Sequence, residues 1–543
     1  MSPHFTIHLS AADYLIIVIY LVVTISLGLH FARRWKKSED FFLAGRSLTW
    51  PIIGLSLFAT NISAEHFVGL AAGGNREGLV QGCYEWMACY CLLMLAGVFA
   101  PQYLKHKVFT IPEYFEKRFG AQVRMLLTIY FLVMIIFTKS SVALYSGTRV
   151  LCDLTGWDFQ FILWGIGIFT AVYTMVGGLA AVVYTDALQA IILIGGSMVL
   201  TGLGMDQAGG WSGLTERLQQ LGKTDLLSMV KGPESNSSFI GFILGNFLVG
   251  GMFYWCMDQV NVQRVLGAKN VREARLGAIF AGFLKIIPVF ILVLPGVIAA
   301  ALALDIHGSN GAADYNRTYS VLVQTLLPAG LKGLVLAALL AALMSSISSM
   351  YNSASTLVAR DLVARFHPGT SQNTQILVGQ LALLMVMVGG ILTTPLIGRY
   401  AHLWEYLQEV TAYFSVPFAV VGLCGVFIRR VNRSGAYAAI LTGVTMSALL
   451  MTDSHTQGGL LSILRHPYLN SFLTRSFLCA LMSFIALITV SMLTPRPAEA
   501  VQTGVFSFSW KRGEGESDHD LRLAGIWMAV LFISVTTLFW IFR

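Results

Sequence analysis

Apolar stretches follow one another along most of the chain, and short polar loops separate them. Most stretches are close to the roughly 20 residues that an α-helix needs to span a bilayer. Hydropathy predicts fourteen spanning helices. They begin near residues 12, 51, 83, 122, 158, 178, 240, 275, 321, 374, 403, 434, 470 and 521. The pattern therefore predicts an all-α polytopic membrane protein.

Polar residues interrupt the second predicted span. Within the run 58–69, Asn61, Ser63, Glu65 and His66 break an otherwise apolar segment. Hydrocarbon cannot hydrogen-bond such groups, so each would cost several kcal/mol if it faced lipid. We expect them to line a cavity inside the protein, which makes this break a candidate functional site. The alternative is a seam of hydrogen bonds between helices.

The seventh predicted span is interrupted in a related way by the glycine pair Gly250 and Gly251 at mid-depth. It lies five spans after the first interruption. This spacing is expected of two inverted five-helix repeats whose broken helices face each other at the membrane centre. Glycine pairs also let helices pack closely, so the prediction of a repeat depends on both interruptions together.

Composition agrees with a membrane protein and excludes several other classes. Of the 543 residues, 56% are hydrophobic and 12% are charged, whereas a soluble protein has about twice that charged fraction. The net charge of +8 does not indicate nucleic-acid binding, because the basic residues lie in short loops beside the spans. The first apolar run, 14–32, is long and precedes a basic cluster, so no cleavable signal peptide is evident. The seven cysteines lie in or beside apolar spans, and we predict no disulfide.

Alternate loops are rich in lysine and arginine, and these loops are predicted to be cytoplasmic. Both termini would then lie outside, in agreement with an even number of spans. The Ala64-Glu65 pair favours a bacterial source and therefore the inner membrane. Residues 207–238 are predicted to form a polar exterior loop. The segment 318–362 is too long for one span and is predicted to begin with a helical arm outside the membrane.

Five polar side chains within the spans are candidates for one solute pocket: Asn61, His66, Glu85, Lys285 and Gln408. Together they supply donors, acceptors, one acid and one base. A polyhydroxylated neutral solute needs this mixture, because each hydroxyl both donates and accepts hydrogen bonds. For Lys285 the alternative is a structural salt bridge with Glu85 or Asp186.

Aromatic side chains near these positions are candidate gates. Tyr84, Tyr254, Trp255 and Trp404 could stack on a sugar ring and close the pocket. Ordinary packing remains the alternative for each of them.

A serine-rich helix face is a candidate ion site. Ser345, Ser346, Ser348 and Ser349 would offer neutral oxygens beside the unwound backbone of a neighbouring helix. Hard monovalent cations favour such a weak oxygen shell, because it also allows release. Serines on helices also bond back to carbonyls or allow close packing, and that alternative stays open.

The chain has no nucleotide-binding loop and no metal-type His/Cys spacing. We therefore expect no cofactor and no enzymatic activity, with energy supplied by an ion gradient or by the gradient of the solute. An intramembrane hydrolase would need a paired acid or metal set, which the sequence lacks.

Several motifs resemble the sodium/solute symporter family, and specifically its sodium/glucose (galactose) cotransporter branch. The resemblance covers nearly the whole chain. Its motifs lie at 39–47, 58–69, 84–86, 177–186, 254–259 with Gln263-Arg264, and Ser345-Ser346 with 352–356.

The resemblance implies a LeuT-like core of ten helices in a 5+5 inverted repeat. Residues 1–47 would hold an extra helix and a cytoplasmic loop, 48–206 the first repeat and 207–238 the exterior loop. Residues 239–430 would hold the second repeat, and 431–543 three further helices with a cytoplasmic loop.

The resemblance also implies roles for individual residues. The sodium ligands match Ala59, Ile62, Ala342, Ser345 and Ser346. The sugar-contacting positions match Asn61, His66, Glu85, Lys285 and Gln408. The outer gates match Leu70, Tyr84 and Trp404, and the inner gate matches Tyr254 beside Trp255.

Three positions depart from the bacterial galactose type. Gly251 stands where that type has Asn, His66 where it has Gln, and Ala88 where it has Ser. Glucose, galactose, another hexose and inositol all remain possible solutes.

Ser348 raises the question of a second ion. Family members that couple two sodium ions tend to have a hydroxyl at this position. We hypothesise a second, weaker sodium site formed by Ser345, Ser348, Ser349 and Asp186, with Ser63 nearby.

The sequence thus predicts a transporter that couples inward sodium movement to uptake of a small neutral sugar. Its partners are sodium, the sugar and the bilayer, and a monomer is expected to suffice. One rival is a symporter of the same fold for inositol, sialic acid or an amino acid. The other is a membrane sensor that binds solute without transport.

Overall fold

The computed structural model describes residues 9–32, 37–307, 311–397, 403–455, 471–497, 513 and 516–543. Side chains at 32, 403–405 and 453–455 lie outside this description. Helices make up all the regular secondary structure in the described residues. The predicted all-α class is therefore confirmed.

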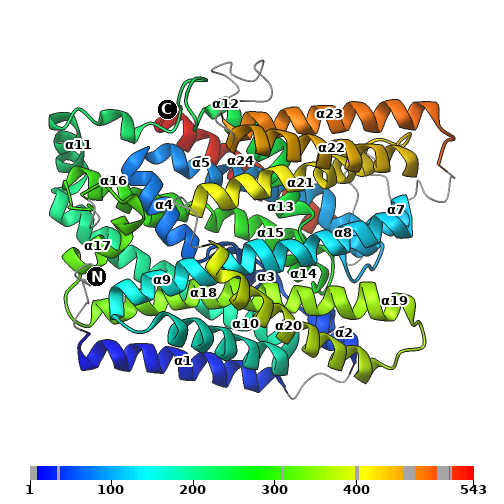
Figure 1. Ribbon diagram of the computed structural model, residues 1–543, viewed down its shortest axis with the longest axis horizontal. Coiled ribbons are helices and arrows are strands. Elements are labelled where there is room, and N and C mark those ends of the chain that lie inside the picture. Colours follow the sequence, from blue (N-terminus) through cyan, green and yellow to red (C-terminus); the bar gives the residue numbers. More distant parts are fainter. Residues whose placement is uncertain are drawn as a thin grey trace.

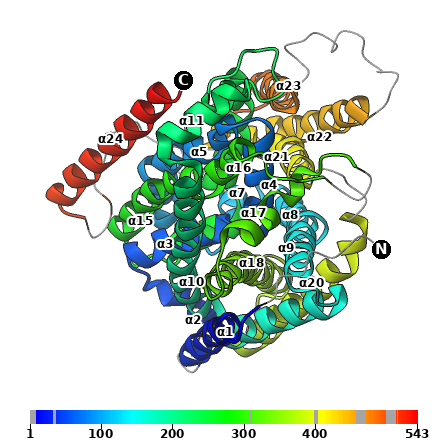
Figure 2. The same cartoon turned by 90° about the vertical axis from the view of Figure 1, so that its left-hand side faces the viewer.

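Most of the long helices run along the long axis of the molecule (Figure 1). Within the described residues, twelve helical stretches are long and apolar enough to cross a membrane. The most buried contains α18 (Leu331–Thr356), with 89% of its apolar window buried. The corresponding values for α1 (Ala11–Ala32) and α24 (Asp518–Ile541) are 17% and 22%. Figure 2 accordingly shows α18 inside the bundle and α1 and α24 at its edge, where an apolar helix surface suits contact with lipid.

The region 48–206 forms an almost continuous series of helices. Two of its α-helices carry π-helical insertions, η3 (Leu95–Phe99) and η4 (Ile135–Ser140), and η2 (Leu79–Gly82) is a 3-10 turn. The α-helices are α3 (Trp50–Asn61), α4 (Ala64–Arg76), α5 (Cys83–Met94), α6 (Ala100–Lys105), α7 (Ile111–Phe119), α8 (Ala121–Met134), α9 (Ser141–Thr155) and α10 (Phe159–Ala208). Before them lie α2 (Ser38–Leu43) and η1 (Ala44–Arg46).

The region 239–430 forms a second such series. Its π-helical stretches are η6 (Phe242–Gly251), η7 (Val289–Val293) and η9 (Leu357–Val363), and η8 (Tyr315–Arg317) is a 3-10 turn. Its α-helices are α12 (Phe239–Gly241), α13 (Met252–Cys256), α14 (Gln259–Leu266), α15 (Val271–Leu284), α16 (Leu294–Ala301), α17 (Thr318–Leu326), α18, α19 (Ala364–Phe366), α20 (Gln372–Ile397) and α21 (Leu403–Phe427). Then follow α22 (Arg433–His455), α23 (Phe472–Leu493) and α24.

The backbone break predicted in the second span is confirmed. α3 ends at Asn61, Ile62 and Ser63 are extended, and α4 begins at Ala64. The φ/ψ angles of Ile62 are −85°/114° and those of Ser63 are −126°/−178°. Backbone carbonyls at the end of α3 are thereby freed from the helical ladder.

The second predicted interruption is placed differently. The glycine pair Gly250-Gly251 does not unwind the helix but ends the ten-residue π-helical stretch η6. The helix breaks later, at Met257, whose φ/ψ angles are −132°/−12°. Asp258 then caps α14 by accepting a hydrogen bond from the backbone N–H of Val260 at 2.9 Å. π-helical segments are often found at functional sites, because they turn side chains out of the regular register.

Two predicted spans lie in one helical stretch, α10, which has 50 residues. A helix of that length measures about 75 Å, more than twice the hydrocarbon thickness of about 30 Å. Gly178 interrupts it with φ 60° and ψ −156°. A Cβ at this position would lie 2.5 Å from the carbonyl oxygen of Phe41, so only glycine fits the bend.

The predicted exterior loop 207–238 contains a helix that sequence analysis missed. α11 (Gly210–Gln220) buries Leu214 and Leu218, and η5 (Thr224–Leu227) follows it. Its polar composition concealed an amphipathic pattern. The division predicted within 318–362 is confirmed, since α17 ends at Leu326 and α18 begins at Leu331.

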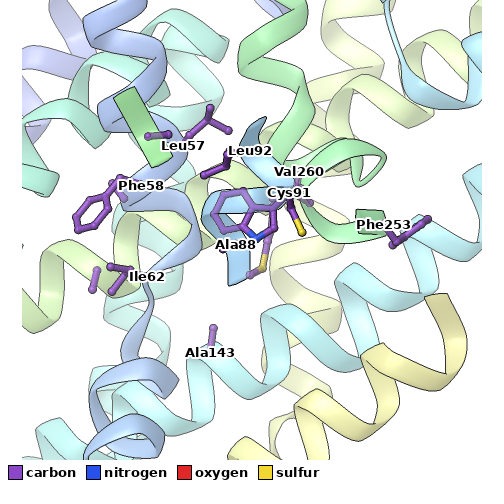
Figure 3. Close-up of a cluster of buried hydrophobic side chains, with 14 of the residues drawn as sticks. Leu57, Phe58, Ile62, Ala88, Cys91, Leu92, Ala143, Phe253 and Val260 are labelled. Atoms are coloured by element: carbon purple, nitrogen blue, oxygen red, sulfur yellow. The ribbon is translucent and has the colours of Figure 1, made fainter. Parts of the chain in front are cut away.

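An apolar cluster packs around the α3–α4 break. Leu57, Phe58 and Ile62 are completely buried. Figure 3 shows them grouped with side chains from α5, α9, α13 and α14, namely Ala88, Cys91, Leu92, Ala143, Phe253 and Val260. This packing holds the extended segment in one position, so that its carbonyls and polar side chains can form a site.

Candidate functional site

A cavity lies beside the α3–α4 break. Its volume is about 110 Å³. Eight of the predicted solute-contacting and gating residues line it: Asn61, His66, Tyr84, Glu85, Tyr254, Trp255, Lys285 and Gln408.

Lys285 joins three helices at one side of this cavity. It caps α15 at its C-terminus and is completely buried. Its ammonium group forms an ion pair with Glu85 of α5 and donates a hydrogen bond to Asn61 Oδ1 at 2.5 Å. It also lies 5.5 Å from the centre of the Trp255 ring. Of the two salt-bridge partners expected for Lys285, Glu85 is the one that it contacts.

Asn61 connects this ion pair to the predicted inner gate. Its Nδ2 donates to the hydroxyl of Tyr254 at 3.1 Å, while its Oδ1 accepts from Lys285. Tyr254 is further held through its carbonyl, which accepts from Asn261 Nδ2 at 3.0 Å. One N–H and one lone pair of the Asn61 amide remain for a solute hydroxyl.

His66 is oriented by the backbone of the break. Its Nδ1 accepts a hydrogen bond from the Ser63 N–H at 3.4 Å. A neutral ring therefore carries its proton on Nε2, which lies 3.9 Å from Glu85 Oε1. The ring thus presents a donor at the cavity wall beside the carboxylate.

The predicted sodium ligands converge on the backbone of the break. The Ser345 hydroxyl lies 2.8 Å from the Ala59 carbonyl oxygen and 3.0 Å from that of Ala342. The Ser346 hydroxyl lies 2.9 Å from the Thr60 carbonyl oxygen and 3.4 Å from that of Ile62. Both serines are buried.

This donor set fits a hard monovalent cation, because every oxygen is neutral. The structure adds the Thr60 carbonyl to the predicted ligands. Each hydroxyl can turn its proton away and direct a lone pair at an ion.

The residues of the hypothesised second sodium site are only partly brought together. Thr60 joins Asp186 to Ser349, with hydroxyl distances of 3.2 Å to Asp186 Oδ2 and 3.0 Å to Ser349 Oγ. Ser348 instead donates to the Ser345 carbonyl at 2.9 Å, and Ser63 donates to Glu65.

A basic residue already lies beside Asp186. Arg264 of α14 bonds to Ser349, and its Nη2 lies 3.7 Å from Asp186 Oδ2. The other carboxylate oxygen of Asp186 is buried and has no partner among the described residues. A second ion would therefore share this carboxylate with Arg264.

The predicted gates differ in position. Tyr84 lines the cavity and packs edge-on against Phe242 with ring centres 4.7 Å apart. Tyr254 and Trp255 are also in edge contact, at 5.3 Å. Leu70 is completely buried but does not line the cavity. The side chain of Trp404 lies outside the described residues.

Several cavity residues were missed by sequence analysis. They include Asn246 and Thr411. Glu65, which was expected to line a cavity, does so and accepts a hydrogen bond from the Ser63 hydroxyl. Lys139 also lines the cavity, forms an ion pair with Asp258 and lies 5.5 Å from the centre of the Tyr254 ring. An ionisable residue in the middle of the apolar run 121–155 was the available signal for Lys139.

Known proteins resemble this chain over most of its length. The model of the sodium:solute symporter family matches residues 41–443. Sodium/glucose cotransporter 1 of Ovis aries is 36% identical over 484 residues, which cover 83% of this chain and 73% of that protein. Sodium/myo-inositol cotransporter of Canis lupus familiaris is 34% identical over 555 residues, which cover 92% of this chain and 76% of that protein.

A solved structure supports the fold. The substrate-bound outward-open state of a Na⁺-coupled sialic acid symporter aligns with a TM-score of 0.78 at 22% sequence identity. The alignment covers 90% of this chain and 99% of that one. At this identity the likeness shows a shared fold of helices and not a shared solute.

Proposed function

The chain belongs to the sodium:solute symporter family, and from that premise we propose that it couples inward sodium movement to uptake of a neutral sugar by alternating access. Members of this family are sodium-coupled transporters and not enzymes. One observation carries the proposal. The α3–α4 break presents its carbonyls to Ser345 and Ser346 and the Asn61 side chain to the cavity.

This shared segment gives coupling a physical route. Sodium held by the Ala59, Thr60 and Ile62 carbonyls would fix the extended backbone that carries Asn61. Sodium shifts the equilibrium between the outward-open and inward-open states only if it binds one of them more tightly, because equal affinity for both leaves the equilibrium unchanged. We propose that sodium binds first and favours the outward-open state, which raises the affinity for solute.

The charges of the cavity favour a neutral solute. Both described lysines that line it are already paired, Lys285 with Glu85 and Lys139 with Asp258. A carboxylate solute would have to displace one of these carboxylates, whereas hydroxyls can add to the existing network. The sodium/glucose and sodium/myo-inositol cotransporters among the relatives are consistent with a polyhydroxylated solute.

We further propose fourteen spans around a 5+5 inverted repeat in 48–206 and 239–430. The α3–α4 pair would count as one span and α10 as two, divided at Gly178. Figure 1 supports an even number of crossings, because α1 begins and α24 ends at the end of the molecule that carries α11. With the basic loops inside, both termini lie outside a bacterial inner membrane, and a monomer suffices.

The solute is identified by uptake into proteoliposomes driven by an inward sodium gradient. Labelled glucose, galactose, myo-inositol, sialic acid and proline are compared under the same gradient. We expect saturable uptake of a hexose or inositol that neither sialic acid nor proline inhibits. Uptake of sialic acid or proline alone would contradict the sugar assignment but keep the symporter, and binding without uptake of any solute would indicate a sensor.

The number of ions is tested through Ser348. If the second site exists, Ser348→Ala is expected to lower the sodium-to-solute flux ratio from two to one, because the weaker ion loses a ligand. The matched control is Ser355→Ala, which alters a buried serine of the same helix whose hydroxyl has no partner among the described residues. A wild-type flux ratio of one would remove the second site.

A further inference from the structure

Asn246 is a cavity residue whose side chain has no role in the contacts described above. It lies in η6, lines the cavity and is half-buried. Within the described part of the chain its amide has no protein hydrogen-bond partner. The cavity amide at the α3–α4 break, Asn61, is already bonded to Lys285 and Tyr254. Asn246 therefore keeps both donors and its acceptor available.

The π-helical geometry explains why this amide faces the cavity. In a π-helix the hydrogen bonds join residues five apart, so Asn246 stacks directly against Gly251. A Cβ at Gly251 would lie 2.9 Å from the Asn246 carbonyl oxygen. A Cβ at Gly250 would lie 4.0 Å from Asn246 Oδ1. Because both neighbours lack side chains, nothing on η6 covers the amide from this side.

Gly251 stands where a galactose-type pocket has an amide side chain. In this chain η6 carries an amide five residues earlier, about one π-turn away, at Asn246. It lies closer to α12, the end of the segment that follows the exterior region. The amide is thus retained on this wall of the cavity but displaced along it.

We propose that Asn246 binds hydroxyls of the solute and sets the choice among polyhydroxylated neutral solutes, an inference that rests on the proposed sugar transport. An amide can donate to one hydroxyl and accept from its neighbour, so it recognises a vicinal diol. Its displacement from position 251 directs it at a different pair of hydroxyls. A solute that lacks either hydroxyl leaves the amide unpaired, and such a loss is costly in a site built for hydrogen bonding.

The test compares wild type, Asn246→Ala and the double variant Asn246→Ala/Gly250→Asn in sodium-driven uptake by proteoliposomes. The probes are D-glucose, D-galactose, myo-inositol and the monodeoxy analogues of the best of the three. Asn246→Ala is expected to raise KM for the best solute about tenfold, as for the loss of hydrogen bonds worth about 1.4 kcal/mol. In wild type one or two adjacent deoxy positions should cost a similar factor, and in Asn246→Ala these positions should cost nothing further.

The double variant separates recognition from structure. Position 250 accommodates a Cβ without a close contact, so Gly250→Asn returns an amide to the same wall. It is expected to recover part of the lost affinity, with a changed order of deoxy analogues. Leu248→Ala is the control for disturbance of η6, since Leu248 is 40% exposed and does not line the cavity.

The outcomes are distinct. KM values for Asn246→Ala within twofold of wild type for all three solutes would overturn the inference and leave the transporter intact. The inference is also overturned if each deoxy analogue loses the same factor in affinity in wild type and in Asn246→Ala. If wild type takes up none of the three, the proposed sugar transport fails, and the role of Asn246 fails with it.

Discussion

Replacing Glu85 with alanine is expected to abolish high-affinity solute binding and to destabilise the protein. The change leaves the Lys285 ammonium buried without its counter-charge, and breaking a buried ion pair from one side costs about 3–5 kcal/mol. It also removes the carboxylate that faces His66 at 3.9 Å. We expect the KM for solute uptake to rise by at least about 100-fold. Thermal unfolding in detergent measures the loss of stability separately.

A double variant distinguishes lost stability from lost recognition. Glu85→Leu/Lys285→Met removes both charges, and replacing a buried pair by apolar residues is often neutral for stability. The double variant should unfold near the wild-type temperature yet bind solute as weakly as Glu85→Ala. Solute affinity close to wild type in either variant would show that the pocket is assigned to the wrong residues.

Ser345→Ala is expected to raise the sodium concentration for half-maximal uptake about 10- to 100-fold. The variant loses one oxygen of the predicted sodium shell, and hydrogen bonds or dipoles directed at a charge contribute about 1.5–3 kcal/mol. Solute affinity at saturating sodium should change little, because Ser345 faces the break and does not line the cavity.

Two further variants serve as controls for the measurement of sodium dependence. Ser345→Thr keeps the hydroxyl and should retain most of the sodium affinity. Ser355→Ala, on the same helix, should leave it unchanged. An unchanged sodium dependence in Ser345→Ala would remove this serine from the ion site.

Much of the arrangement was predictable because it depends on polarity at a given depth. Asn61, Ser63 and His66 interrupt an apolar span, and the structure breaks the helix at Ile62 and Ser63. The intramembrane charges Glu85 and Lys285 had few possible partners, and they pair with each other.

The remaining features depend on helical register, which polarity does not reveal. The π-helical stretch η6 keeps the helix intact through Gly250-Gly251 and shifts the break to Met257. An i→i+5 ladder has no distinct residue pattern, so the approach of Asn246 to Gly251 could not be read from spacing. The pairing of Arg264 with Asp186 was also hidden, because the two residues are 78 positions apart on α14 and α10. Lys285 was the partner expected for Asp186, and no spacing in the sequence indicated Arg264.

Coupling between sodium at the α3–α4 break and transport of the solute from the adjoining cavity is the central prediction. It is tested by measuring the steady-state solute ratio across proteoliposomes at a clamped potential of about 100 mV and a tenfold sodium gradient. One sodium ion then releases about 3.7 kcal/mol, which supports about 500-fold accumulation, and choline in place of sodium on both faces should abolish accumulation. Equal accumulation in choline and in sodium would contradict the account.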